Sequence, residues 1–236
     1  MSGEKPILIV DCYLDEGGGT GNFSRQLGDK KWISVRPTRE ALPIPNIGDW
    51  SAVMITGSGA CLADGYEGVG LRMGWTHELI EWVKLVVAAD IPLLGVCFGH
   101  QIIGAAFGGG VRKSAVPEVG FKDIHVHGDD PLLAPLHPKF VCFVSHEDEV
   151  ASAGELDVIA STADCAIHAV RVPQRRAWGV QFHSEMLLDE ATSLLQYRKK
   201  KHGLEAIDID AELEKSKTCL PLASILFGRF LELAGA

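Results

Sequence analysis

A cysteine that follows an apolar run and precedes a small, apolar helical pattern is the residue best placed for chemistry in this sequence. The run at residues 91–96 is typical of a buried strand, and the helical pattern begins directly after Cys97. This strand–turn–helix context is that of the G-x-S-x-G nucleophile elbow, here Gly-Val-Cys-Phe-Gly at residues 95–99. The glycines allow strand and helix to approach each other at a sharp, strained turn. Cys97 would then stand at a helix N-terminus, whose positive end favours a thiolate nucleophile.

A thiol nucleophile needs a base, and the base needs a partner that orients it. Among the nine histidines, His183 is best placed because it lies just beyond the strand-like run at residues 177–182, where a sheet presents groups at its carboxyl edge. Glu185 follows two residues later, and on an extended chain such positions point the same way. The pattern predicts that Glu185 orients one ring nitrogen of His183 while the other faces Cys97.

An acyl-transfer site also needs hydrogen-bond donors for the oxyanion. One donor is expected from the backbone amide of Phe98, directly after the nucleophile, as in other elbows. A second donor could come from the glycine-rich turn at residues 57–60, since glycine lets backbone amides approach a ligand closely. The same residues are equally compatible with an ordinary turn, so the pattern leaves the second donor open.

The elements that must position these residues alternate between strand-like runs and helical patterns, which predicts a parallel sheet with helices on both faces. The second half of the chain has shorter runs with turn residues between them, which predicts a partly antiparallel extension. The expected strands cover residues 6–13, 32–35, 51–56, 91–96, 124–126, 140–144, 157–161, 166–172 and 177–182. The expected helices begin near Asn22 and after Cys97, and cover residues 74–89, 189–201 and 207–234.

Composition and charge narrow the class of protein. The chain has 236 residues, 47% of them hydrophobic, which is enough for one large core, and we expect a single domain over residues 1–236. The formal charge of -9 argues against a nucleic-acid-binding surface, and no apolar run reaches the length of a membrane span. The N-terminus lacks a signal-peptide pattern, and the six scattered cysteines form no C-x-x-C pair. We therefore expect a cytoplasmic protein without a disulfide framework.

Two weak signals for bound groups do not carry a prediction. His125 and His127 share a strand face but lack a third metal ligand nearby. The glycine-rich segment at residues 16–22 lacks the third glycine of G-x-G-x-x-G and the lysine of a P-loop, which favours a flexible loop near the active-site edge. We therefore expect neither a metal nor a cofactor.

Two motifs together resemble the class I, triad-type glutamine amidotransferases. They are Gly-Val-Cys-Phe-Gly-His-Gln at residues 95–101 and Gly-Val-Gln-Phe-His-Ser-Glu at residues 179–185. The likeness covers nearly the whole chain and is closest to the amidotransferase domain of GMP synthase and its free-standing relatives. It implies a flavodoxin-like α/β fold, a three-layer sandwich whose central sheet is mostly parallel with a small antiparallel extension. It also implies Cys97 as nucleophile, His183 as base and Glu185 as the orienting partner.

The resemblance further assigns residues around the reacting carbonyl. It implies oxyanion donors at the backbone amides of Gly59 and Phe98, and it makes Gln101 a residue that helps to hold the α-amino-acid end of glutamine. The segment at residues 145–150 is similar to the family's His-Gly-Asp loop, whose backbone lines the glutamine pocket. The residues expected at the substrate are Gly57, Ser58, Gln101, His146, Glu147 and Asp148.

One position departs from the family pattern, since Glu147 stands where the family's subunits often have glycine. The His-x-Asp-Glu-Val form is similar to free-standing members, including plant γ-glutamyl peptidases. The resemblance implies glutamine or another γ-glutamyl compound as substrate, hydrolysed through a cysteine thioester, with ammonia passed to a possible separate synthase. The alternatives are a γ-glutamyl peptidase that acts on γ-glutamyl peptides or conjugates, and a non-catalytic binding or regulatory module on the same fold.

Overall fold

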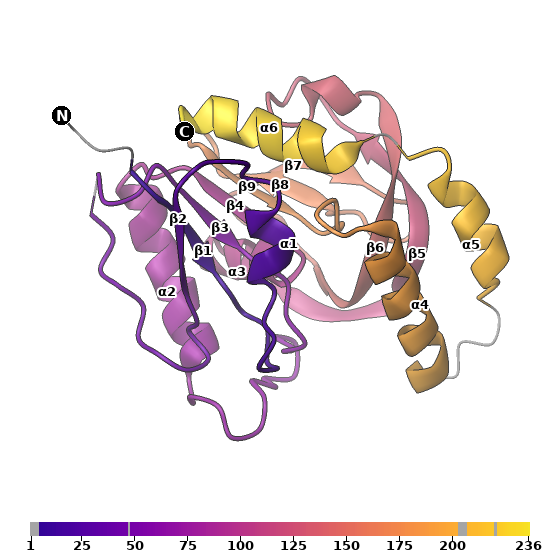
Figure 1. Ribbon diagram of the computed structural model, residues 1–236, viewed down its shortest axis with the longest axis horizontal. Helices are drawn as coiled ribbons and strands as arrows, with labels where there is room; N and C mark the ends of the chain where they lie inside the picture. The colour runs from indigo at the N-terminus through magenta and orange to yellow at the C-terminus, as the bar shows by residue number, and fades with distance from the viewer. Residues whose placement is uncertain (1–4, 47, 203–206, 220) are drawn as a thin grey trace.

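The chain forms a layered α/β structure around one mixed sheet (Figure 1). The computed structural model describes residues 5–46, 48–202, 207–219 and 221–236, and the nine strands of the sheet lie within them. Five neighbouring strands run parallel to one another. In sheet order they are β2 (Trp32–Val35), β1 (Ile7–Val10), β3 (Ala52–Ile55), β4 (Leu93–Val96) and β9 (Ala177–Val180).

The remaining four strands extend the same sheet with antiparallel pairing, beginning beside β9. In sheet order they are β8 (Ala169–Arg171), β7 (Asp157–Ser161), β5 (Val111–Val126) and β6 (Lys139–Val150). A 3-10 turn, η1 (Ala134–Leu136), lies between β5 and β6 in the chain. The expected parallel sheet with an antiparallel extension is confirmed, and the run expected at residues 124–126 is the end of the longer strand β5.

Helices cover both faces of the parallel strands because successive side chains of a buried strand point to opposite faces. Along β1, Ile7 and Ile9 belong to one core cluster, whereas Leu8 and Val10 belong to another. The helices of the first cluster are α1 (Thr20–Ser24) and α6 (Leu222–Ala234), and those of the second are α2 (Trp75–Ala88) and α3 (Phe98–Ala106). The alternation along one strand therefore produces the predicted three layers.

Two further helices, α4 (Leu188–His202) and α5 (Ile209–Ser216), lie against the long antiparallel pair β5–β6 (Figure 1). Leu195 of α4 packs with Phe143 of β6 in a separate small core cluster. The backbone amide of His183 donates to the Phe143 carbonyl at 2.9 Å. The segment that carries His183 is therefore held beside β6 on its way from β9 to α4.

The single helix expected over residues 207–234 is wrong, because α5 and α6 are separate helices. Pro221 is the N-cap of α6, with φ −71° and ψ 64°, a conformation outside the helical region. Proline also lacks the backbone N–H that a continuous helix would need at this position. The helix therefore starts again at Leu222 rather than running through from α5.

No helix in the described part of the chain is both long enough and apolar enough to span a membrane. The single domain over residues 1–236 and the cytoplasmic location stay predictions.

Candidate active site

The turn after β4 has the strained geometry of a nucleophile elbow. Cys97 has φ 52° and ψ −102°, and positive φ is uncommon for a residue other than glycine. A Cβ at Gly95 would lie 2.4 Å from the backbone oxygen of Gly99, and one at Gly99 would lie 2.6 Å from the Ile55 oxygen. Both positions therefore require glycine for strand and helix to approach this closely. The Cys97 amide donates to Val180 of β9 at 2.8 Å, which anchors the turn at the sheet edge.

Side chains from three separate segments meet around Gly57, just after β3. A Cβ placed at Gly57 would lie 3.8 Å from the Cβ of Cys97 and 3.4 Å from Cε1 of His183. The same point lies 3.6 Å from the hydroxyl oxygen of Tyr13. The expected nucleophile and base therefore lie together, beside a glycine that leaves space for a small group.

A buried carboxylate holds the imidazole of His183. Nδ1 of His183 lies 2.7 Å from Oε1 of Glu185, and both side chains are buried. Burial alone lowers the pKa of His183, but the charges of Glu185 and Cys97 outweigh burial and raise it to about 10. The raised pKa therefore favours the imidazolium form of His183, and an imidazolium stabilises a thiolate beside it.

Tyr13 lies at the same site, although the sequence pattern did not single it out. Burial raises the pKa of Tyr13, and the charges of Glu185 and Cys97 add to the rise, so the hydroxyl keeps its proton. A Cβ at Gly19 would lie 2.1 Å from a carbon of the Tyr13 ring, so the glycine-rich loop packs directly on this ring. The available signal was topological, because Tyr13 follows β1 at the carboxyl edge of the parallel strands.

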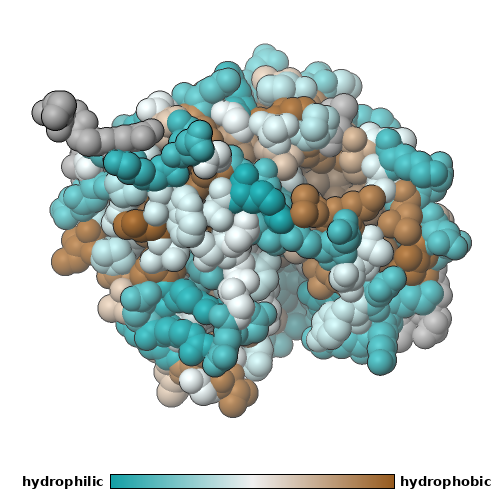
Figure 2. Space-filling view, in the orientation of Figure 1, coloured by the Kyte–Doolittle hydropathy of each residue, from teal (hydrophilic) through white to brown (hydrophobic). Residues whose placement is uncertain are grey.

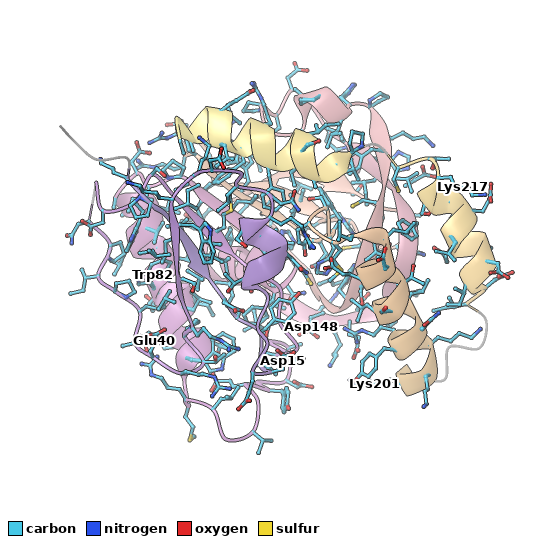
Figure 3. The ribbon with its side chains drawn as sticks, viewed as in Figure 1. Asp15, Glu40, Trp82, Asp148, Lys201 and Lys217 are labelled. Carbon is cyan, nitrogen blue, oxygen red and sulfur yellow. The ribbon has the colours of Figure 1, made fainter. Side chains whose placement is uncertain are left out.

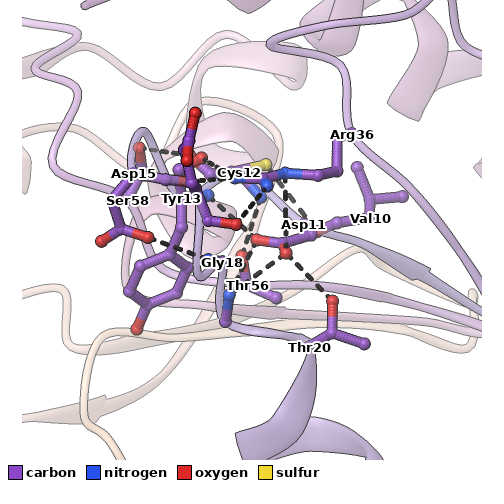
Figure 4. A network of polar contacts seen from close by, with 12 residues as sticks. Val10, Asp11, Cys12, Tyr13, Asp15, Gly18, Thr20, Arg36, Thr56 and Ser58 are labelled. Carbon is purple, nitrogen blue, oxygen red and sulfur yellow. Dashed lines mark hydrogen bonds and ion pairs between the residues drawn. The ribbon is translucent and has the colours of Figure 1, made fainter.

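One buried carboxylate, that of Asp11, folds the loop that carries Tyr13 (Figure 4). Asp11 accepts hydrogen bonds from the backbone amides of Tyr13 and Gly19, each at 3.1 Å. It also accepts from the Thr20 hydroxyl at 2.9 Å, and the Arg36 guanidinium lies 3.8 Å away. The glycine-rich segment is therefore held at the edge of the site, as the sequence predicted for its position.

The two expected oxyanion donors are backbone amides in different settings. Phe98 is the first residue of α3, so its N–H has no acceptor one turn earlier in the helix. Gly59 lies in the turn after β3. The Ser58 hydroxyl holds this turn, because it donates to the Cys12 carbonyl at 2.7 Å and accepts from the Ala60 amide at 3.0 Å. The Ser58 side chain therefore supports the turn that carries Gly59.

Gln101 and Asp148, both expected at the substrate, are joined within the protein. The Gln101 side-chain amide donates to the Asp148 backbone oxygen at 2.9 Å. The Asp148 carboxylate accepts from the Cys61 thiol at 2.9 Å and from the Ala63 amide at 3.2 Å, with Lys113 at 3.7 Å. Asp148, labelled in Figure 3, thereby ties β6 to the loop after β3. These side chains position the local backbone through contacts with protein groups.

The other two residues expected in the pocket, His146 and Glu147, have different surroundings. His146 is buried, and its Nε2 lies 3.0 Å from Oε2 of Glu118, also buried. Glu147 forms an ion pair with Arg198 of α4. The carboxylate that departs from the family pattern is therefore neutralised by a neighbouring helix.

A cleft of about 380 Å³ is lined by His183 and by mostly apolar residues from β5, β6 and the starts of α4 and α6. The apolar part includes Phe121, Phe143, Met186, Leu187 and Leu222. Figure 2 shows apolar surface gathered on the side of the molecule where α4 and α6 lie. The candidate base therefore has a mainly apolar cavity beside it.

The sequence of this chain matches a known family over most of its length. Residues 49–199 match the family described as "Glutamine amidotransferase class-I". The chain belongs to the class I glutamine amidotransferases. The matched residues include both the elbow and the histidine motif, so the resemblance carried by these two motifs is confirmed.

Two curated relatives of this amidotransferase are named as glutamine-hydrolyzing GMP synthases. The protein from Syntrophomonas wolfei is 37% identical over 102 residues, 43% of this chain and 20% of the relative. The relative from Methanothermobacter thermautotrophicus, which is named as one subunit of the enzyme, is 31% identical over 105 residues, 44% of this chain and 56% of the relative. The chain thus spans about half or less of the length of these relatives.

A solved structure shows the same fold. A glutamine amidotransferase from Thermotoga maritima superposes with a TM-score of 0.80 over 99% of both chains, at 14% sequence identity. An identity this low shows the fold alone. The flavodoxin-like α/β architecture implied by the sequence is confirmed.

Proposed function

We propose that this amidotransferase hydrolyses a γ-glutamyl amide, converting glutamine to glutamate and ammonia through a cysteine thioester. The observation that carries the proposal is the meeting of Cys97, His183 and Gly57 at the carboxyl edge of the parallel strands. A thiol on a strained elbow, at a helix N-terminus and beside a cationic imidazole, is activated as a nucleophile. Glu185 completes the proposed triad as the group that orients and charges His183.

In the proposed reaction, the Cys97 sulfur bonds to the side-chain carbonyl carbon, and the carbonyl oxygen takes the negative charge. The amides of Gly59 and Phe98 donate to this oxyanion, and a donor of this kind contributes about 3–4 kcal/mol to the transition state. The C–N bond breaks as His183 gives its proton to the departing ammonia, which leaves a γ-glutamyl thioester. His183 then takes a proton from the attacking water, and glutamate leaves as the thiolate re-forms.

For the other end of the substrate, we propose contacts with the backbone of Gly57, Ser58 and residues 146–148. The hydrogen bonds of Ser58 and the Gln101–Asp148 pair support this proposal because they fix both backbone segments. The Glu147–Arg198 ion pair lies next to the same segment. Its paired carboxylate would repel the α-carboxylate of glutamine less than a solitary one would.

We further propose that the ammonia passes to an acceptor on a separate synthase subunit. The Methanothermobacter relative is named as one subunit of a GMP synthase, which supports a division of the reaction between chains. The chain's own contribution in this proposal is the hydrolysis step, since the family match covers the segment that holds Cys97 and His183.

A γ-glutamyl peptidase is the second candidate function, and the cleft beside His183 favours it. A peptide or conjugate releases an amine that is larger than ammonia, and His183 is the group that would protonate this amine. The cleft of about 380 Å³ reaches His183 and has mostly apolar walls, although Cys97 and Gly57 do not line it. The same triad would serve both substrates, because the reacting carbonyl is the same.

The test is mass spectrometry after treatment with a glutamine-analogue chloroketone, followed by a substrate panel. We expect one adduct, on Cys97, with labelling strongly reduced in His183→Gln and unchanged in His125→Gln, since His125 is exposed on β5. Turnover of glutamine supports the amidotransferase, whereas strong hydrolysis of a γ-glutamyl dipeptide with negligible glutaminase activity supports the peptidase. An unlabelled Cys97, with and without a candidate synthase, would leave only the non-catalytic module.

A further inference from the structure

A second cluster of buried ionisable side chains takes no part in the proposed reaction. Glu118 of β5, His146 of β6 and His168, directly before β8, each place one ligand atom within 4.8 Å of the others. All three are buried, and His168 is 0% exposed. We propose that these residues supply three ligands to one divalent metal ion of the zinc type, inside the antiparallel part of the sheet.

The two separations from the Glu118 oxygen suit a tetrahedral ion. Nε2 of His146 lies 3.0 Å and Nε2 of His168 lies 3.4 Å from the same oxygen, Oε2 of Glu118. Zinc bonds of about 2.0–2.1 Å in tetrahedral geometry place neighbouring ligand atoms about 3.3 Å apart. Two imidazole nitrogens with one carboxylate oxygen are a donor set that proteins use for zinc where a water or another small ligand takes the fourth position. The two contacts to Glu118 therefore already have the separation that the ion requires.

The hydrogen-bonding capacity of His146 argues for a cation at this point. Its Nδ1 lies 3.1 Å from the backbone oxygen of Asp148, and its Nε2 faces the carboxylate of Glu118, so both nitrogens face acceptors. A neutral imidazole donates through one nitrogen only. With an ion between Nε2 and Glu118, the ring keeps its proton on Nδ1 for Asp148 and gives its Nε2 lone pair to the metal.

His168 supplies an independent observation. Neither of its ring nitrogens has a hydrogen-bond partner within the described ranges, although the side chain is fully buried. Buried polar groups without partners cost free energy, so such a group in a folded protein needs an explanation. A metal bound at Nε2, the nitrogen that lies 3.4 Å from Glu118, would give that nitrogen a partner.

The contacts around His146 and Glu118 match the second layer of known metal sites. A ligating histidine usually donates its other N–H to a carbonyl or carboxylate, and a ligating carboxylate is itself hydrogen-bonded. Here Nδ1 of His146 faces the Asp148 carbonyl, and Oε1 of Glu118 accepts from the Thr162 hydroxyl at 2.7 Å. These contacts leave Nε2 of His146 and Oε2 of Glu118 directed at each other, where the ion would lie.

The ion would join three segments that are far apart in the sequence. Because His146 directly precedes Glu147 and Asp148, the site would also fix the backbone proposed to line the substrate pocket. This consequence rests on the proposed function, whereas the binding of the metal does not. Failure of either proposal is therefore visible separately, as lost metal or as lost turnover.

The experiment uses the full chain refolded from denaturant with Zn²⁺ or Co²⁺, because a buried site takes up its ion as the protein folds. We expect about one ion per chain by plasma mass spectrometry after gel filtration. The Co²⁺ form should show the visible bands of nitrogen and oxygen ligation, without the thiolate charge-transfer band that the six cysteines would give. Glu118→Gln and His168→Gln should lose the ion, and His125→Gln, an exposed histidine on the strand of Glu118, should keep it.

Refolded wild-type protein without stoichiometric metal would overturn the proposal, as would thiolate bands in the Co²⁺ form. Retention of the ion by both cluster variants would overturn it equally. If the variants do not fold, nitrogen NMR of the wild type decides: a metal-free His146 with protons on both nitrogens means a buried ion pair instead of a metal site.

Discussion

Two buried imidazole–carboxylate pairs lie in this molecule, and they differ in what surrounds the ring. His183 contacts Glu185 at 2.7 Å and lies beside Cys97 and the gap at Gly57. His146 contacts Glu118 at 3.0 Å, and its other nitrogen faces a backbone carbonyl. The first pair has an open side next to a thiol, whereas protein groups enclose the second.

The pKa values of the histidines in the two regions are shifted in opposite directions. For His183, the charges of Glu185 and Cys97 outweigh burial and raise the pKa to about 10. For His168, which shares Glu118 with His146, burial prevails and lowers the pKa. A neighbouring thiol and an adjacent open space therefore distinguish a pair that can move protons to a substrate from a pair that holds segments together.

Removal of the nucleophile gives the largest effect that this comparison predicts. Cys97→Ala should lower kcat for the γ-glutamyl substrate by about 10⁶-fold, because the thioester cannot form. Cys97 packs in the core at 7% exposure, and alanine removes only the sulfur, so the fold should persist. Steady-state turnover and circular dichroism of the same preparation check both statements. Residual activity within a factor of about 10 of the wild type would mean that another nucleophile acts.

Loss of the charge of Glu185 and loss of the charge of Glu118 should affect different properties of the protein. Glu185→Gln should lower kcat by about 10³–10⁴-fold, as expected when the partner of a catalytic histidine loses its charge. Glu118→Gln should change kcat by less than about 10-fold. It should instead lower the free energy of unfolding by about 3–5 kcal/mol, because it removes the buried carboxylate that His146 and His168 both face.

Kinetics and denaturant unfolding of both variants measure this contrast. Equal losses of kcat in the two variants would show that the enclosed cluster takes part in the reaction. A stable Glu118→Gln variant would show that the cluster contributes little to the fold.

The first of these pairs could be predicted from the sequence and the second could not, for a physical reason. Cys97 lies in a local motif, and His183 and Glu185 are two residues apart in another, so the topology of a parallel sheet brings the motifs to one edge. Glu118 and His168 approach His146 only through strand register in the antiparallel part, which no local pattern encodes. The predicted absence of a metal considered only His125 and His127, which are two residues apart in the sequence.

Tyr13 and the break between α5 and α6 show the same limit at smaller scale. The role of Tyr13 depends on the packing of its ring under Gly19, which is a contact between loop residues. The helix break depends on Pro221, whose signal is present in the sequence because proline seldom continues a helix. Strand positions in the parallel half, by contrast, followed directly from the apolar runs.

Selective alkylation is a third test of the difference between the site around Cys97 and the enclosed parts of the molecule. Burial raises the pKa of the other five cysteines, which are Cys12, Cys61, Cys142, Cys165 and Cys219. With iodoacetamide at pH 7, Cys97 should react at least about 10-fold faster than any of them, because His183 and the helix N-terminus favour its thiolate. Mass spectrometry of timed samples measures the order. In Glu185→Gln the rate at Cys97 should fall, and a faster reaction at another thiol would contradict the assignment.

The smallest expected effect is the pH dependence of stability. The pKa of His183 is about 10 in the folded state and about 6.5 in an unfolded chain. A raised folded pKa stabilises the protein fully below about pH 6.5, and this stabilisation is lost as the pH rises toward 10.

Glu185→Gln removes one source of the raised pKa, so the difference in Tm between wild type and variant should shrink by a few degrees over this range. Glu232→Gln, an exposed carboxylate on α6, is the control, and its difference from the wild type should stay constant. Thermal melts from pH 6 to pH 10 measure both differences. Parallel curves for wild type and Glu185→Gln would mean that Glu185 does not favour the charged form of His183, and the electrostatic distinction between the two pairs would then fail.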